Sequence, residues 1–185
     1  MSGEPTANAR VGYIGIGIMG RAAAANLIDA GYTLTVNSRT PSTADHLVER
    51  GAAYADTPAA VASACDVVFL NVPDTPDVEK VLFGEDGLAS AEGFKGLVID
   101  MSTIDPAATV EIARRLGESG IEFVDAPVSG GEAGAIAGTL SVMAGGSDEA
   151  FETARPLLEV VGERVTHVGP AGAGQVAKAC NQLLV

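Results

Sequence analysis

The sequence is poor in aromatic, basic and cysteine residues. It has no tryptophan, aromatic residues make up 4% of its 185 residues, and 11 Lys and Arg stand against 24 Asp and Glu. The resulting formal net charge of −13 argues against nucleic acid as a partner, because phosphate backbones bind to basic surfaces. An anionic ligand must therefore be held by local groups, and not by the overall field of the protein.

Long apolar runs are also missing. No stretch is long and apolar enough to span a membrane, so we expect no membrane partner. Cys65 and Cys180 lie far apart in apolar contexts, which predicts two reduced, buried thiols in a cytoplasmic protein, with no disulfide and no metal site. Residues 1–10 are polar and are expected to form a flexible leader.

Hydrophobic residues, in contrast, make up 47% of the chain, and glycine contributes 23 residues. This composition is typical of a tightly packed α/β protein and argues against disorder. Strand-like and helix-like segments alternate at short spacing, which predicts a doubly wound, Rossmann-type α/β fold with a mostly parallel sheet. The predicted strands cover 11–14, 32–36, 52–54, 66–72, 96–101, 121–127, 139–144 and 163–168, and the predicted helices cover 21–30, 41–50, 57–64, 75–82, 105–119, 147–160 and 172–185.

A G-x-G-x-x-G pattern at Gly15, Gly17 and Gly20 lies between the first predicted strand and the first predicted helix. A second strand follows, and this β-turn-helix-β context is that of a dinucleotide-binding turn. The glycines allow a tight turn, close approach of the backbone to a pyrophosphate, and close packing of helix on strand. The free N–H groups at the helix start favour phosphate oxygens. We expect Ile18 and Met19, inside the turn, to contact the cofactor too.

The end of the second strand bears on which cofactor binds. A NAD site is expected to carry an acidic residue about 20 positions after the turn, which accepts the ribose hydroxyls. This chain has Asn37, Ser38, Arg39 and Thr40 there, and no Asp or Glu from 32 to 44. Arg39 would pair with a 2′-phosphate, helped by two hydroxyls, which predicts NADP(H), with NAD(H) as the alternative. The alternative is a purely structural role, in which Arg39 faces solvent and Thr40, with the proline that follows it, starts a helix.

Other candidate residues follow predicted strands. Ligands bind at the carboxyl ends of the strands in open parallel sheets, so these residues are expected to meet at one edge. The residues in such positions are Val72, Pro73, Thr103, Ser129, Gly130 and Gly131.

The last predicted helix carries Lys178, Asn181 and Gln182 at positions i, i+3 and i+4, which places them on one face. Reduction of a carbonyl by a hydride needs a proton donor, and the reverse reaction needs a base. A partly buried lysine loses its charge more readily and can exchange a proton near neutral pH. Composition alone leaves it open whether Lys178 does so or extends to solvent.

Four motifs together resemble the β-hydroxyacid dehydrogenases, which include 3-hydroxyisobutyrate dehydrogenase, tartronate semialdehyde reductase and plant-type glyoxylate/succinic semialdehyde reductases. The motifs lie at 15–20, 125–131, 138–146 and 172–182, in the family's order and spacing. The resemblance implies an oxidoreductase acting on a small 3-hydroxy acid or semialdehyde, and the Arg39 segment predicts that it uses NADP(H).

The same resemblance assigns roles to individual residues. It implies that Lys178 is the catalytic acid/base and that Asn181 and Gln182 orient the lysine or the substrate hydroxyl. It further implies that Ser129, Gly130 and Gly131 hold the substrate carboxylate, and that Val72, Pro73 and Thr103 lie along the cofactor towards its nicotinamide.

This chain departs from the family's pattern in two ways. Many members have Asn where this chain has Gln182, and the Lys-x-x-Asn-Gln pattern resembles the tartronate semialdehyde reductase branch. Members also continue into an all-helical domain that closes the site and forms most of the dimer. We therefore expect residues 11–170 to form the NADP-binding domain and 171–185 to begin a helix leading to that domain, so that these 185 residues bind cofactor with little turnover. The apolar face of 177–185 predicts association with a second copy or with such a domain.

Three other functions remain open. The first is a non-catalytic nucleotide-binding module. The second is an imine reductase, a class that shares the glycine turn and usually lacks this lysine. The third is a 6-phosphogluconate dehydrogenase, which typically has a His-Asn pair after its lysine, and this pair is absent at Cys180 to Gln182.

Overall fold

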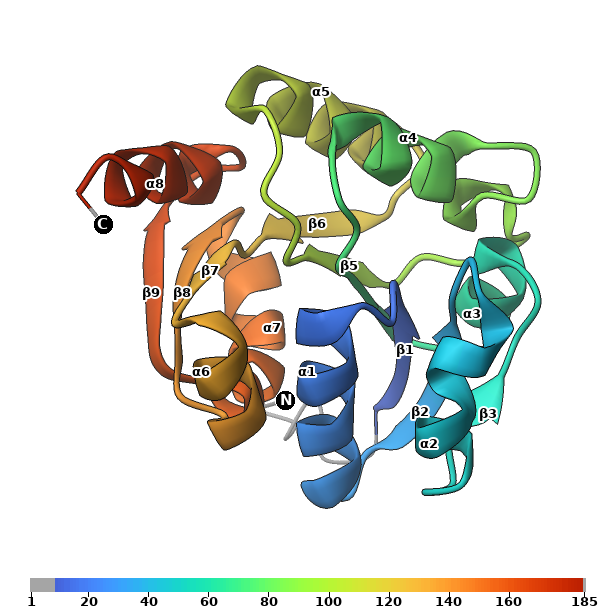
Figure 1. Ribbon diagram of the computed structural model, residues 1–185. Helices are drawn as coiled ribbons and strands as arrows, with labels where there is room; N and C mark the ends of the chain where they lie inside the picture. The colour runs from blue at the N-terminus through green and yellow to red at the C-terminus, as the bar shows by residue number, and fades with distance from the viewer. Residues whose placement is uncertain (1–8, 185) are drawn as a thin grey trace, which may run out of the picture.

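The computed structural model describes residues 9–184, in which the strands form one sheet flanked by helices (Figure 1). The sheet order is β3-β2-β1-β4-β5-β6-β8-β7, and β9 pairs with β8. The strands are β1 (Arg10–Ile14), β2 (Thr33–Asn37), β3 (Ala53–Tyr54), β4 (Val67–Leu70), β5 (Leu97–Asp100), β6 (Glu122–Asp125), β7 (Val128–Ser129), β8 (Leu140–Gly145) and β9 (Gly162–Gly169). The helices are α1 (Ile18–Asp29), α2 (Asp45–Val48), α3 (Pro58–Ala64), α4 (Thr75–Phe83), α5 (Pro106–Glu118), α6 (Gly131–Ala137), α7 (Asp148–Val161) and α8 (Ala173–Gln182), with short 3₁₀ turns η1 (Pro41–Ala44) and η2 (Leu88–Ser90).

The six strands from β3 to β6 in this order are parallel, as the sequence predicts, and the doubly wound α/β fold is confirmed. The exceptions are β8, which runs antiparallel to β6 and β7, and β9, which pairs parallel with β8. Asp125 pairs with Gly145 and Ser129 pairs with Ser141, which is one continuous register. Strands β6 and β7 therefore pair one after the other with β8, and β7 places Ser129 beyond the end of the parallel sheet.

The central strands are buried on both faces. In β4, Val67 and Phe69 belong to one core cluster, whereas Val68 and Leu70 belong to the other. Helices α1 and α7 contribute to the first core, and α3, α4 and α5 to the second, so one helical layer covers each face of the sheet (Figure 1). Successive side chains of a strand point to opposite faces of the sheet. A strand that is buried on both faces is therefore a continuous apolar run in the sequence, as Val67–Leu70 is.

Four of the eight α-helices in residues 9–184 start where the sequence provides a side-chain cap. Thr57, Asp74, Asp105 and Ser147 each accept a hydrogen bond from the backbone N–H three residues further on. Such a cap satisfies one of the free donors of the first turn and contributes about 1 kcal/mol. The starts predicted at Thr57, Asp105 and Ser147 are confirmed.

Some elements differ from the prediction. Helix α6 is not predicted from the sequence, because its glycine-rich segment has low helix propensity. The helix forms because Ala135 is fully buried and its carbonyl accepts a hydrogen bond from Asn26 Nδ2 of α1, at 2.8 Å. The helix predicted over 41–50 is divided into η1 and α2, and the last helix ends at Gln182.

The predicted leader also needs a correction at its end. Residues 1–8 lie outside the described part of the chain, but Arg10 opens β1. Its guanidinium donates to both carboxylate oxygens of Asp66, at 3.2 and 2.6 Å, and its backbone N–H donates as well, at 3.0 Å. This two-pronged pairing lowers the pKa of Asp66 and fixes the start of β1 against β4.

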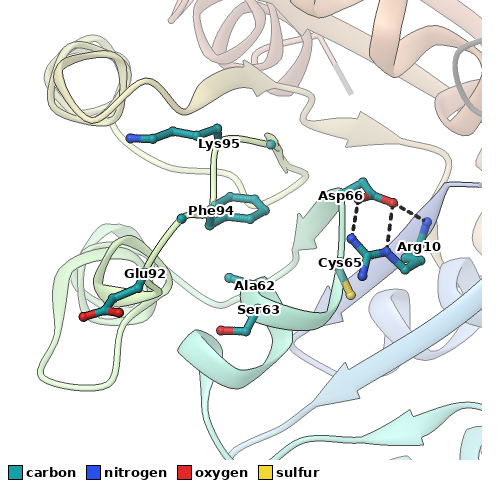
Figure 2. A pocket seen from close by; sticks show the side chains of 10 residues that line it. Arg10, Ala62, Ser63, Cys65, Asp66, Glu92, Phe94 and Lys95 are labelled. Atoms are coloured by element: carbon teal, nitrogen blue, oxygen red, sulfur yellow. Dashed lines mark hydrogen bonds and ion pairs between the residues drawn. The ribbon is translucent and has the colours of Figure 1, made fainter.

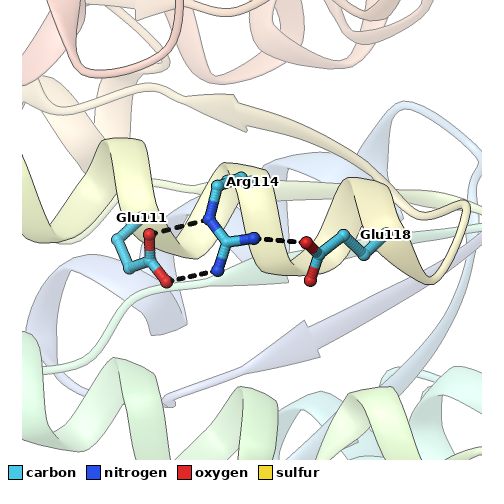
Figure 3. A network of polar contacts seen from close by, with 3 residues as sticks. All are labelled: Glu111, Arg114 and Glu118. Atoms are coloured by element: carbon cyan, nitrogen blue, oxygen red, sulfur yellow. Dashed lines mark hydrogen bonds and ion pairs between the residues drawn. The ribbon is translucent and has the colours of Figure 1, made fainter.

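The outer face of α5 carries an exposed ion-pair network, in which Arg114 reaches Glu111 at 2.7 Å and also pairs with Glu118 (Figure 3). Exposed pairs at this spacing add little to stability, so the helix depends on its buried face. In residues 9–184, no helix combines the length and the apolar character that crossing a membrane requires.

Candidate functional site

The glycine turn between β1 and α1 is built by close backbone contacts. A Cβ added to Gly15 would lie 2.2 Å from the backbone oxygen of Asn71, and one added to Gly20 would lie 2.1 Å from the backbone oxygen of Gly15. Gly17, in contrast, is exposed, and an added Cβ would meet nothing within 4 Å. It is the N-cap of α1, and no side chain caps this helix. The turn therefore presents free N–H groups beside open space, which fits the pyrophosphate of a dinucleotide.

The segment after β2 lies at the same edge of the sheet. Arg39 is exposed and forms no ion pair within residues 9–184. The Ser38 hydroxyl lies 2.8 Å from the Thr43 hydroxyl, and Thr40 is the N-cap of η1. Asn37 is buried, and its amide nitrogen donates to the carbonyl of Ala55, so this side chain shapes the loop and its nitrogen is already engaged.

The segments after β4 and β5 are tied to each other. The backbone N–H of Val72 donates to the Ser102 hydroxyl at 3.0 Å, and the backbone N–H of Ser102 donates to Asp100 Oδ1 at 2.9 Å. Pro73 and Thr103 are both exposed beside this link. The predicted residues of these two segments therefore share one edge of the sheet with the glycine turn.

Helix α8 and strand β7 bring four polar side chains together. Lys178 Nζ donates to Gln182 Oε1 at 2.6 Å, and Asn181 Nδ2 lies 3.4 Å from the same oxygen. Asn181 Nδ2 also donates to Ser129 Oγ, at 3.3 Å. Lys178 is only 8% exposed, and burial lowers its pKa. The structure thus joins Lys178, Asn181, Gln182 and Ser129 into one network, with Gly130 and Gly131 exposed directly after Ser129.

Two buried residues that the sequence analysis did not single out hold α8 in place. Asp125 accepts hydrogen bonds from the backbone N–H groups of Gly172, at 2.7 Å, and Gln175, at 3.0 Å. The Gln175 side chain is 2% exposed, donates to the carbonyl of Ser102 at 2.8 Å and accepts from the N–H of Ile104 at 3.2 Å. These contacts join segments about 50 and 70 residues apart, so no local sequence pattern signals them.

Asp100 and Asp125 form a register pair, each as the last residue of its strand. Burial raises the pKa of both, and that of Asp100 rises to about 7. Asp100 Oδ2 has no hydrogen-bond partner among the described residues. One sequence signal could have indicated Asp100 and Asp125. Each is an acidic residue at the end of an apolar strand, directly before candidate site residues.

A separate hollow of about 350 Å³ lies at the opposite edge of the sheet, at the amino ends of β1, β4 and β5 (Figure 2). The Arg10–Asp66 pair and Cys65 line it together with Lys95, and none of the predicted site residues does so. Cys65 is buried, as predicted, and burial raises the pKa of its thiol. The same prediction for Cys180 is wrong, because this residue lies on the exposed side of α8.

Comparison with models of protein families matches residues 10–169 to the NAD binding domain of 6-phosphogluconate dehydrogenase. The chain belongs to this family of NAD-binding domains. Among curated proteins, the 2-hydroxy-3-oxopropionate reductase of Escherichia coli (strain K12) is 47% identical over 95% of this chain and 60% of its own length. The NAD-dependent L-serine dehydrogenase of Pseudomonas aeruginosa is 44% identical over 95% and 59%, respectively. The chain thus spans about 60% of the length of the curated relatives it matches.

Solved structures agree with this assignment to the NAD-binding family. Mycobacterium tuberculosis 3-hydroxyisobutyrate dehydrogenase with L-serine has a TM-score of 0.89 and 34% identity, over 96% of this chain and 60% of the other. Psf3 in complex with NADP+ and 2-OPP has a TM-score of 0.90 and 34% identity, over 94% and 62%. A Streptomyces aurantiacus imine reductase has a TM-score of 0.86 and 30% identity, over 95% and 61%.

The resemblance to the β-hydroxyacid dehydrogenases is confirmed by the reductase and the 3-hydroxyisobutyrate dehydrogenase among these relatives. The family description and the NADP+ complex support a nicotinamide cofactor for this domain. Relatives named for NAD and for NADP+ both occur, so the comparisons leave the choice between the two cofactors open.

Proposed function

We propose that this chain forms the cofactor domain of an NADP(H)-dependent oxidoreductase of the β-hydroxyacid dehydrogenase type, which interconverts a small 3-hydroxy acid and the matching semialdehyde. The observation that carries this proposal is the network from Lys178 through Gln182 and Asn181 to Ser129. It joins an amine whose pKa is lowered by burial to a polar anchor beyond the end of the parallel sheet. The name of the Escherichia coli relative supports the substrate class.

The proton chemistry falls to Lys178. A bound nicotinamide supplies or accepts the hydride, and the chain must then give or take one proton at the substrate oxygen. Burial disfavours the charged form of the Lys178 amine, which makes its proton easier to transfer. Gln182 orients Lys178 Nζ through a neutral amide oxygen. A carboxylate in this place would stabilise the charged form of the amine more strongly.

Ser129, Gly130 and Gly131 are proposed to hold the substrate carboxylate. Because the Ser129 oxygen accepts the hydrogen bond from Asn181, the hydroxyl hydrogen of Ser129 remains available to donate to an anion. The glycines that follow have φ of +138° and +64°, and their exposed backbone N–H groups can add to a small anion-binding turn.

The cofactor is proposed to lie along the carboxyl ends of β1, β2, β4 and β5. The glycine turn would bind the pyrophosphate, and the segments after β4 and β5 would border the nicotinamide. The residues in these proposed positions are Gly15, Gly17, Ile18, Met19, Gly20, Asn37, Ser38, Arg39, Thr40, Val72, Pro73 and Thr103. Arg39 supports NADP(H), because its exposed guanidinium is free of ion pairs within residues 9–184 and can pair with a 2′-phosphate.

An imine reductase is the second candidate, and the similar Streptomyces aurantiacus structure favours it. The network around Lys178 weighs towards a hydroxy acid, since it offers both an acid/base and a carboxylate anchor. The proposal also includes association with a helical domain or with a second copy. The exposed side chains of Val176, Leu183 and Leu184, at 51%, 87% and 88%, support such a contact on α8 and just after it.

The test starts with thermal unfolding of the chain in the presence of NADPH or NADH, because a ligand that binds the folded form raises its stability. NADPH is expected to stabilise wild type more than NADH, and Arg39→Ala is expected to lose that difference. Equal stabilisation of Arg39→Ala and wild type by NADPH would contradict the cofactor assignment. A panel of small semialdehydes and cyclic imines then separates the two enzyme classes, and we expect at most weak turnover from these 185 residues alone.

A further inference from the structure

In residues 9–184, one buried side chain, that of Gln175, hydrogen-bonds the proposed nicotinamide segment after β5 to the helix that carries Lys178. Gln175 lies one helical turn before Lys178, at i−3, and therefore on the same side of α8. Its amide nitrogen donates to the carbonyl of Ser102, and its amide oxygen accepts from the N–H of Ile104. Both groups flank Thr103, in the segment that we propose borders the nicotinamide.

The link extends to the neighbouring strand. The Ser102 hydroxyl accepts the hydrogen bond of the Val72 N–H, so Gln175 is connected through Ser102 to the segment after β4 as well. Asp125 meanwhile fixes the backbone of Gln175 itself, at 3.0 Å. The Gln175 side chain, whose own backbone is held by Asp125, thus connects the segments after β4 and β5 to α8, the helix that carries Lys178.

Helix α8 packs tightly against the sheet at the residue before Gln175. A Cβ added to Gly174 would lie 2.3 Å from the backbone oxygen of Met143 and 2.7 Å from Asp125 Oδ2. The helix therefore rests on β8 and β6 by backbone contact at the residue next to Gln175. Within residues 9–184, the Gln175 amide is the side chain that hydrogen-bonds the Ser102–Ile104 segment to α8, so a displacement of Thr103 acts on α8 through it.

We propose that Gln175 is a positioning residue, which sets the place of the Lys178 amine relative to the segments that border the nicotinamide and transmits cofactor binding to that amine. This inference rests on the proposed function. It assigns Gln175 no contact with cofactor or substrate. Its effect passes through Ser102 and Ile104 on one side and through α8 on the other.

The chain offers a direct readout, since it has three lysines, Lys80, Lys95 and Lys178. Labelling with [ε-¹³C]lysine gives one methylene signal for each, and the two exposed lysines serve as internal references. The positions of the three signals are recorded from pH 7 to pH 11, with and without NADPH, and NADPH affinity is measured separately by fluorescence titration.

In wild type, NADPH is expected to shift the Lys178 signal and its titration midpoint, and to leave Lys80 unchanged. Gln175→Met removes both amide hydrogen bonds at similar side-chain volume. In this variant the NADPH-induced change at Lys178 is expected to be lost, while NADPH affinity stays within about tenfold, because the glycine turn and Arg39 are intact. Gln175→Glu keeps an oxygen that accepts from the Ile104 N–H and loses the N–H group that donates to the Ser102 carbonyl. This second variant replaces Gln175→Met in the test if Gln175→Met does not fold.

Two control variants separate positioning from general loosening. Cys180→Ser alters an exposed side chain of the same helix, and Leu47→Ala removes a core side chain from α2, at the far end of the sheet from α8 (Figure 1). Both are expected to keep the wild-type response at Lys178. A wild-type response in a folded Gln175 variant overturns the positioning role and leaves the proposed function intact. NADPH binding to wild type without any change at Lys178 overturns the proposed function, and the positioning role with it.

Discussion

Asp100 is expected to govern the pH dependence of stability above pH 5. Its side chain is fully buried at the end of β5, where Oδ1 accepts from the Ser102 N–H at 2.9 Å and Oδ2 has no hydrogen-bond partner in the described chain. Burial raises the pKa of this carboxyl group from 3.8 to about 7. The acid accepts from the backbone N–H of Ser102, which directly precedes Thr103, so its titration bears on the proposed cofactor edge.

The sign follows from the proton count of the two states. Between the unfolded pKa of 3.8 and the folded pKa of about 7, the folded chain retains a proton that the unfolded chain has released. Stability is therefore greatest below this window and falls as pH rises, by up to about 1.4 kcal/mol per pH unit and roughly 4 kcal/mol in total by pH 8. Asp66, whose pKa is lowered by Arg10, acts with the opposite sign, and its contribution is lost only as the pH falls below about 4.

Asp100→Asn tests this account, since asparagine keeps the acceptor for the Ser102 N–H and does not titrate. Urea unfolding followed by circular dichroism from pH 5 to pH 8 is expected to show a steep fall in stability for wild type. A clearly shallower fall is expected for Asp100→Asn, in which Asp125, whose pKa burial also raises, still titrates. Asp56→Asn, at an exposed site, serves as the control and is expected to follow wild type. Parallel profiles for wild type and Asp100→Asn would refute the reasoning.

Two further predictions concern the ligand sites. Gly20→Ala places a Cβ 2.1 Å from the backbone oxygen of Gly15, so we expect a lower Tm and loss of NADPH binding, whereas Gly17→Ala, with open space around it, is expected to keep Tm and weaken only NADPH binding. Thermal unfolding with and without NADPH measures both, and equal Tm values for the two variants would contradict the steric argument. Ser129→Ala is expected to leave NADPH affinity unchanged and to weaken the binding of a small 3-hydroxy acid at saturating NADPH by at least about tenfold, since a hydrogen bond to a charged group contributes about 1.5–3 kcal/mol. Isothermal titration calorimetry checks this, and undiminished acid binding would remove Ser129 from the carboxylate site.

Much of the fold could be predicted because its signals are local. The apolar run at Val67–Leu70 serves two cores at once, and the caps at Thr57 and Ser147 act within one helical turn. The glycine turn is also a local pattern, since the close contact of Gly20 with the backbone oxygen of Gly15 lies within the motif itself.

The support of the site could not be predicted in the same way. Gln175 and Asp125 act through contacts with segments tens of residues away, and nothing in their local sequence shows that they are buried. Helix α6 forms against its glycine content because Ala135 packs into the core beside α1. Cys180 has apolar neighbours in sequence, but the helix turns it to solvent, since Lys178 and Gln175 occupy the buried side.

The central claim is that the Lys178 amine faces the nicotinamide of a cofactor held by the glycine turn. A ¹³C-filtered NOE experiment on the [ε-¹³C]lysine-labelled chain with saturating NADPH tests it most directly. The account predicts cross-peaks between the Lys178 ε-methylene protons and the nicotinamide ring protons, and none from Lys80 or Lys95. Saturating NADPH binding without any cross-peak from Lys178 would contradict it.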